Sequence, residues 1–248
     1  MKALPLVALA LMLALAAPSR AEKQGYTILT EDLPPFNFVE KGDVKGISTD
    51  LLRLMLEDCG VDARVEDTQV MPWPRALAVA RKQSGAILYS VTRTPEREDW
   101  FKWIGPILDN RISLIARRDR RIRVGALSDA EGFKTGTVRE FASTQLLLLH
   151  GYPERNLEYA ADMRSNALKL NAGRIDLLAG SEHAFAWILP QCGLRPEDFE
   201  TVFVLREGAI YFACSKDMPD ELVDRLQRSL DKLKMSGKAR QIIASYQH

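Results

Sequence analysis

The chain has 248 residues, with 34 basic and 33 acidic side chains and a formal net charge of +1. This near-neutral balance lacks the basic excess of nucleic-acid-binding proteins, so we expect no nucleic-acid partner. Hydrophobic residues make up 46% of the chain, which is enough for the core of one large domain or of two small ones.

The first two dozen residues have the pattern of a secretion signal. Lys2 precedes an apolar run from Leu4 to Ala17, and Ser19-Arg20-Ala21 places small residues at the −3 and −1 positions of a cleavage site. The apolar run is shorter than the roughly 20 residues of a membrane-spanning helix. We therefore expect residues 1–21 to be a signal peptide, cleaved after Ala21, and the mature protein to be periplasmic; an uncleaved anchor is the alternative.

Strand and helix patterns then alternate through the first half of the mature chain. The expected elements are a strand at 26–30, a helix capped by Ser48 or Thr49 and ended by Gly60, a strand at 63–66, a helix at 74–82, and an apolar strand at 85–90. This βαβαβ order predicts a doubly wound parallel sheet, in which the ligand crevice lies at the carboxyl ends of the strands.

The same order restarts in the second half. The expected elements are a strand at 133–138, a helix through 146–149, a strand at 157–159, a helix from Asp162 to Gly173, a strand at 175–179, a late strand at 209–213, and an amphipathic helix carrying Leu222, Leu226, Leu230 and Leu233. The sequence thus predicts an α/β protein of two doubly wound lobes joined by a two-strand hinge. We expect residues 22–110 and 208–248 to form lobe 1 and residues 111–207 to form lobe 2.

Cysteine and histidine residues indicate neither a disulfide-rich fold nor a metal site. Cys59, Cys192 and Cys214 allow at most one disulfide, and Cys192–Cys214 is the favoured pair, although the pairing stays open. The three histidines are far apart in the sequence and lack companion ligands at metal-binding spacing. We expect no metal and no cofactor.

A short segment after the strand at 85–90 has the composition of an anion site. Ser90 and Thr92 lie two residues apart, so on a regular strand their hydroxyls face the same way. Arg97 follows after a turn started by Pro95. Hydroxyl donors and a guanidinium at this spacing can hold a carboxylate.

Taken in order, several motifs resemble the bacterial extracellular solute-binding proteins of family 3, the polar-amino-acid type of ABC-importer binding proteins. The motifs are Pro34-Pro35-Phe36, Gly46-x-x-x-Asp50-Leu51, Thr94-Pro95-Glu96-Arg97, the strand around Gly136, Ala172-Gly173-Arg174-Ile175-Asp176, and Ser236-Gly237. Each motif is weakly specific by itself, but in this order and spacing the motifs together are a strong signal. The resemblance covers nearly all of the mature chain. The resemblance implies a type II periplasmic binding protein-like fold.

The resemblance also implies roles for individual residues. Arg97 occupies the place of the arginine that grips the ligand carboxylate, and Ser90 and Thr92 match hydroxyl and backbone contacts. Phe36 and Trp73 are the aromatic candidates beside the ligand. The alternatives are that Arg97 pairs at the surface with Glu98 or Asp99, and that Trp73 is ordinary core.

The second lobe departs from the amino-acid-binding pattern. Ser181 stands where the family places the aspartate that pairs with the ligand ammonium, and Glu182 is a possible substitute. Arg139-Glu140-Phe141 replaces the usual Gly-Thr/Ser run, although Gly136-Thr137 leaves the register open. Arg139 and Phe141 are therefore further ligand-binding candidates, and the helix start there favours an anion. The carboxylate half of the site therefore resembles the family more closely than the ammonium half.

Three functions follow from the resemblance. The first is a monomeric binding protein that closes over a small carboxylate, most simply an amino acid or a derivative, and delivers it to the permease of an ABC importer. The second is an enzyme similar to periplasmic cyclohexadienyl dehydratases, in which Glu182 donates a proton while Arg97 and Arg139 hold carboxylates. The third is a ligand-sensing partner of a membrane receptor.

Overall fold

A computed structural model describes residues 25–246 of the protein. The expected signal peptide at residues 1–21 lies outside the described residues. Within them, no helix combines the length and the apolar character that crossing a bilayer requires.

Residues 25–246 form an eight-stranded mixed sheet with the order β4-β1-β5-β10-β6-β9-β7-β8. Strand β1 pairs in parallel with β4 and β5, and β7 pairs in parallel with β8 and β9. The strands are β1 (Thr27–Thr30), β4 (Gln69–Val70), β5 (Ala86–Thr92), β6 (Lys102–Arg117), β7 (Thr135–Val138), β8 (Leu157–Ala160), β9 (Leu177–Ser181) and β10 (Phe199–Cys214). The α/β class and the two parallel units predicted from the sequence are confirmed.

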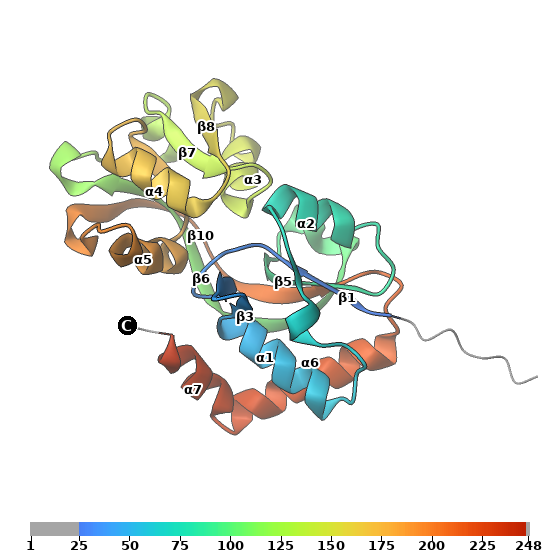
Figure 1. Cartoon of the computed structure of the whole chain (residues 1–248). Helices are drawn as coiled ribbons and strands as arrows, with labels where there is room; N and C mark the ends of the chain where they lie inside the picture. Colours follow the sequence, from blue (N-terminus) through green and yellow to red (C-terminus); the bar gives the residue numbers. More distant parts are fainter. Residues whose placement is uncertain (1–24, 247–248) are drawn as a thin grey trace, which may run out of the picture.

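Helices and strands gather in two lobes (Figure 1). The first lobe holds β1, β4 and β5 with the hairpin of β2 (Phe38–Glu40) and β3 (Asp43–Lys45) and the helices α1 (Ile47–Asp58), α2 (Trp73–Ala80), α6 (Asp220–Met235) and α7 (Lys238–Ser245). The second lobe holds β7, β8 and β9 with α3 (Ala142–Leu149), α4 (Met163–Asn171) and α5 (Glu182–Gln191). The C-terminal helices return to the first lobe, where α6 and α7 pack against α1.

Two long antiparallel strands connect the lobes. Strands β6 and β10 have 16 residues each and pair along most of their length, with Asn110 opposite Gly208 near the middle. The sequence predicted only a short strand at 209–213 and chain crossings near these positions. A local sequence pattern cannot show that β6 and β10 pair, because the paired residues lie about 100 positions apart in the sequence. The lobe boundaries at 110/111 and 207/208 stay a prediction.

Three local predictions differ from the structure. The strand predicted at 63–66 is wrong: Val65–Asp67 is a 3₁₀ turn, closed by backbone bonds from the Asp67 N–H to the Arg64 carbonyl and from the Thr68 N–H to the Val65 carbonyl, both at 3.1 Å, and the strand β4 follows it. Helix α1 begins at Ile47, so Ser48 and Thr49 lie inside it and do not cap it. Strand β9 lies two residues later than the predicted 175–179.

The favoured disulfide is also absent. Cys59, Cys192 and Cys214 are all free thiols. Cys214 ends β10 in the buried core of the first lobe, whereas Cys192 follows α5 in the second lobe, so the two lie on different lobes. Complete burial raises the pKa of the Cys214 thiol to about 12, which keeps it protonated and unreactive at neutral pH.

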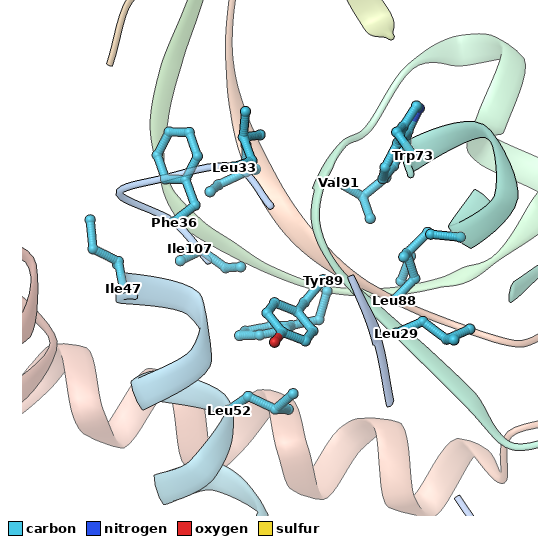
Figure 2. Packing of buried hydrophobic residues seen from close by; sticks show 14 of the residues in the cluster. Leu29, Leu33, Phe36, Ile47, Leu52, Trp73, Leu88, Tyr89, Val91 and Ile107 are labelled. Atoms are coloured by element: carbon cyan, nitrogen blue, oxygen red, sulfur yellow. The ribbon is translucent and has the colours of Figure 1, made fainter. Parts of the chain in front are cut away.

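The core of the first lobe extends to the face that meets the second lobe. Figure 2 shows Leu29, Leu52, Leu88 and Tyr89 in its interior, with Leu33 and Phe36 on the loop after β1, and Trp73 at the start of α2. These last three side chains are buried, and they also line the cavity described below. The core therefore fixes one wall of the candidate site.

The backbone of Gly46 packs directly against the backbone of Phe36, and this contact helps to position Phe36. Gly46 has φ +123°, and an added Cβ would lie 2.5 Å from the Phe36 carbonyl oxygen. The Ser48 N–H donates to the same carbonyl at 2.9 Å. Only glycine fits this contact without strain.

We expect Gly46→Ala to lower the free energy of unfolding by about 2–5 kcal/mol, because it adds both a strained dihedral and a clash with backbone. Urea denaturation of the mature protein measures this loss. Gly60→Ala is the matched control: its φ is +59° but nothing lies within 4 Å of the added Cβ, so only the dihedral cost of about 1 kcal/mol applies. Equal losses in the two variants would contradict the close-approach argument.

Candidate functional site

A cavity lies between the lobes, where the carboxyl ends of β1 and β5 face the start of α3 and the end of β9. Its volume is about 40 Å³, room for about three water molecules. It is lined by Glu31, Leu33, Phe36, Trp73, Ser90, Thr92, Arg97, Asn110, Ile112, Phe141, Ala142, Ser143, Met163, Gly180, Ser181 and Ile210. No group of three or more His, Cys, Asp or Glu side chains in residues 25–246 is placed to hold a metal ion.

Arg97 is the buried cation of this cavity. Its side chain is 1% exposed, donates from Nη1 to the Thr92 carbonyl at 3.2 Å and from Nη2 to the Glu140 carbonyl at 2.5 Å, and has no partner at Nε. Burial lowers its pKa to about 10, so it is still charged at neutral pH. The alternative of a surface pair with Glu98 or Asp99 is wrong, because Glu98 pairs with Arg93 and Arg97 points inward.

Trp73 is held against the second lobe by its indole. Its Nε1 donates to the Glu140 carbonyl at 2.8 Å, and its ring meets Phe141 edge to face with centroids 6.3 Å apart. The Arg97 guanidinium lies 5.3 Å from the Trp73 ring centroid. Trp73 is therefore both core and cavity wall, and the Glu140 carbonyl joins two first-lobe side chains to the second lobe.

Ser90 and Thr92 both reach the cavity, but not by regular strand alternation. Ser90 has φ +63° and lies in a bulge, since Tyr89 and Val91 have partners on β10 whereas Ser90 has none. Its hydroxyl donates to the Ser48 hydroxyl at 2.9 Å. The bulge turns the chain at the end of β5, which is the segment that leads to Arg97.

Polar groups of the second lobe complete the wall. The Ser181 hydroxyl donates to the side-chain Oδ1 of Asn110 at 2.6 Å and caps α5 by accepting from the Ala184 N–H. Phe141 is the N-cap of α3, so Ala142 and Ser143 bring the first-turn N–H groups of that helix to the cavity. First-turn N–H groups have no carbonyl partner within their own helix, so together with the helix dipole they favour an anion.

Arg139 and Glu182 are the two predicted site residues that the structure does not bring to the cavity. The exposed Arg139 guanidinium stacks on the Tyr159 ring, 4.0 Å from its centroid. Glu182 accepts from the Ser113 hydroxyl at 2.6 Å and the Thr201 hydroxyl at 2.9 Å, and it lines a separate groove beside α5. Its carboxylate therefore points away from Arg97.

Glu31 is a cavity residue that the sequence reasoning missed. Its side chain is 8% exposed, and burial raises its pKa well above 4.5, against the lowering effect of Arg97. Within residues 25–246 its carboxylate has no hydrogen bond or ion pair. A sequence signal existed, because Glu31 directly follows β1, whose carboxyl end lies beside that of β5 in the parallel sheet.

The arrangement suits a small organic anion. A buried guanidinium, a helix start and neutral hydroxyls supply donors, and the side chains between them are mostly apolar. Among the cavity-lining residues only Arg97 and Glu31 are ionisable. The site thus has a strong anchor for a negative group and no nucleophile–base pair of the kind that covalent catalysis needs.

The chain is similar to known proteins in both sequence and structure. The profile of the family "Bacterial extracellular solute-binding proteins, family 3" matches residues 26–248. No curated protein matches at a significant level. A histidine kinase sensor domain with similarity to periplasmic binding proteins has a TM-score of 0.78 at 19% identity, over 90% of this chain and 96% of its own.

Two further similar structures are named as solute-binding proteins. An ABC uptake transporter substrate-binding protein from Streptococcus pneumoniae with bound histidine has a TM-score of 0.76 at 17% identity, over 89% of this chain and 92% of its own. An ancestral arginine-binding protein bound to arginine has a TM-score of 0.75 at 17% identity, over 91% and 100%. At these identities the likeness shows the fold.

Proposed function

Because the chain belongs to the bacterial extracellular solute-binding proteins of family 3, we propose that its cavity captures a small carboxylate-bearing solute, an amino acid or a derivative. The observation that carries this proposal is the buried Arg97 guanidinium, which faces the cavity with one nitrogen unpartnered. A buried cation without a counter-ion costs stability, and a ligand carboxylate removes that cost. A guanidinium also matches a carboxylate in geometry.

Capture requires the lobes to separate and close. The present cavity holds only a few water molecules, so a solute of amino-acid size enters when the lobes move apart along β6 and β10 and then rearrange around it. Contacts across the cleft, such as the bonds of Arg97 and Trp73 to the Glu140 carbonyl, support a closed state. A ligand that binds this state more tightly shifts the population toward it.

The closed protein would then act in the periplasm as a monomer that docks on the permease of an ABC importer. The expected signal peptide and the family support this placement. Similar structures named for bound arginine and histidine support an amino acid as the solute class. We expect capture and release to need neither a metal nor a cofactor.

A sensing role is the second candidate, since one similar structure is a histidine kinase sensor domain. The cleft would work in the same way, with the closed form read by a receptor. A strain that lacks the protein distinguishes the two roles: loss of solute uptake supports transport, and normal uptake with a lost response to the solute supports sensing. A dehydratase role assigns the proton donor to Glu182, but the carboxylate of Glu182 lies outside the cavity, in a separate groove beside α5.

A thermal-shift screen of residues 22–248 tests the proposed function. The panel contains the twenty amino acids, small mono- and dicarboxylates, and prephenate-like acids. A solute present at a thousand times its Kd stabilises the protein by about 4 kcal/mol, which is easily measured. Stabilisation by one carboxylate class supports the proposal, and no response to any carboxylate contradicts it.

A further inference from the structure

We propose that Glu31 is the cation anchor of the cavity, so that the preferred solute is a zwitterion whose ammonium is held by the first lobe. This inference rests on the proposed function, because it assumes that Arg97 holds the carboxylate of the same solute. It assigns a role to a residue outside the expected set and it excludes simple carboxylic acids as the best ligands. It also relocates the ammonium contact from the second lobe to the loop after β1.

The first argument is that one acidic and one basic side chain face the same cavity without meeting. Glu31 and Arg97 both line the cavity and both are at least nine-tenths buried. Among the described residues, no ion pair within 4.0 Å joins them or joins either one to another side chain. Both terminal nitrogens of Arg97 donate to backbone carbonyls, and within residues 25–246 no group donates to the Glu31 carboxylate.

The second argument is that no other acidic side chain in the described part of the chain lines the cavity. Ser181 occupies the second-lobe position, and its hydroxyl is committed to Asn110 and to the start of α5. Glu182 binds Ser113 and Thr201 outside the cavity. Asp162 is exposed and caps α4 through the Ser165 N–H at 2.7 Å, and Asp32 lines a separate groove beside α5 and α7. Glu31 is therefore the acidic group left to face the solute.

The third argument is energetic. A buried carboxyl without a partner is costly when ionised, and burial accordingly raises the pKa of Glu31, with Asp32 and Asp162 adding to the rise and Arg97 opposing it. An arriving ammonium supplies the missing counter-charge and makes the ionised form favourable. A group that costs stability in the free protein and gains a partner only with ligand is expected in a binding site.

The test compares an amino acid found by the screen with its desamino analogue, by calorimetric titration of the wild type, Glu31→Gln and Asp32→Asn. We expect the wild type to bind the amino acid at least tenfold more tightly than the analogue. We expect Glu31→Gln to lose about 10- to 100-fold for the amino acid, because a charged hydrogen-bonded pair is lost, and to keep its affinity for the analogue. The retained affinity shows that the variant is folded. Asp32→Asn, the matched neighbour, removes a charge that acts on Glu31 only from a distance, so its loss of affinity for the amino acid should stay below tenfold, and the analogue should bind as it does to the wild type.

Proton release provides an independent readout. Since the pKa of Glu31 is raised in the free protein, an ammonium that ionises it releases a proton to the buffer near and below that pKa. Binding enthalpies in buffers of different ionisation enthalpy should report this release for the wild type and not for Glu31→Gln.

The failure of each idea has its own signature. Equal affinity of the wild type for the amino acid and its analogue, or equal losses for both in Glu31→Gln, would overturn the assignment of Glu31 while leaving carboxylate capture intact. Absence of binding by either solute, or binding that is indifferent to Arg97→Ala, would instead overturn the proposed function itself.

Discussion

Replacing Arg97 by Ala is expected to weaken binding of the solute by about 100- to 10,000-fold. The guanidinium is buried, charged and directed into the cavity, and hydrogen bonds to charged groups contribute about 1.5–3 kcal/mol each. Two such bonds to one carboxylate therefore account for the loss. Titration calorimetry measures it. Arg97→Lys keeps the charge but not the fork, so an intermediate loss is expected.

Arg93→Ala is the matched control for Arg97. Arg93 lies four residues earlier on the same segment and pairs with the half-exposed Glu98 outside the cavity. An exposed pair of this kind contributes at most about 1 kcal/mol to stability and nothing to binding. Similar loss of affinity in the Arg93 and Arg97 variants would show that the segment, and not the cavity guanidinium, determines binding.

Trp73→Ala is expected to lower the free energy of unfolding by about 3–5 kcal/mol, because a large buried side chain leaves a hole at the edge of the core. It should also open the cleft, since the indole carries a hydrogen bond and an edge-to-face contact to the second lobe. Urea denaturation measures the first effect, and small-angle scattering of the ligand-free protein measures the second as a larger radius of gyration.

Trp73→Phe separates the two effects. It keeps a ring for Phe141 but loses the donor to the Glu140 carbonyl, so we expect a loss of about 1–2 kcal/mol and a smaller increase in radius. Trp103→Phe is the control, because Trp103 also donates its indole N–H to a backbone carbonyl, that of Glu98, outside the cavity. A radius of gyration that Trp73→Ala and Trp73→Phe leave unchanged would contradict the role of Trp73 in closure.

The sequence predicted the parts of this fold that depend on local pattern. Apart from the two-residue strand β4, the parallel units follow from strands of four to seven residues joined by capped or glycine-ended helices, as with Asp162 before α4. Arg97 was found because it follows a strand and a Pro95 turn, which places it at the crevice. Strands β6 and β10 were missed in their full length, since pairing between the lobes is decided by residues distant in sequence.

The sequence missed parts of the site where the local backbone conformation decides which of two neighbouring side chains faces the cavity. The bulge at Ser90 cannot be read from strand alternation, and it changes which side chains share a face. Glu31 and Asp32 are adjacent acids after β1, and only the folded loop shows that Glu31 faces the cavity while Asp32 faces another groove. Ser181 and Glu182 present the same ambiguity in the second lobe, where Ser181 lines the cavity.

The central claim is that the cavity holds a solute by its carboxylate. The most direct measurement is a calorimetric titration of the wild-type mature protein with the solute identified by the screen and with the carboxamide of that solute. The carboxamide has the same shape but no negative charge, so we expect it to bind at least 100-fold more weakly than the acid, because the Arg97 guanidinium loses its charged partner. Equal affinity for the acid and the carboxamide would contradict the account.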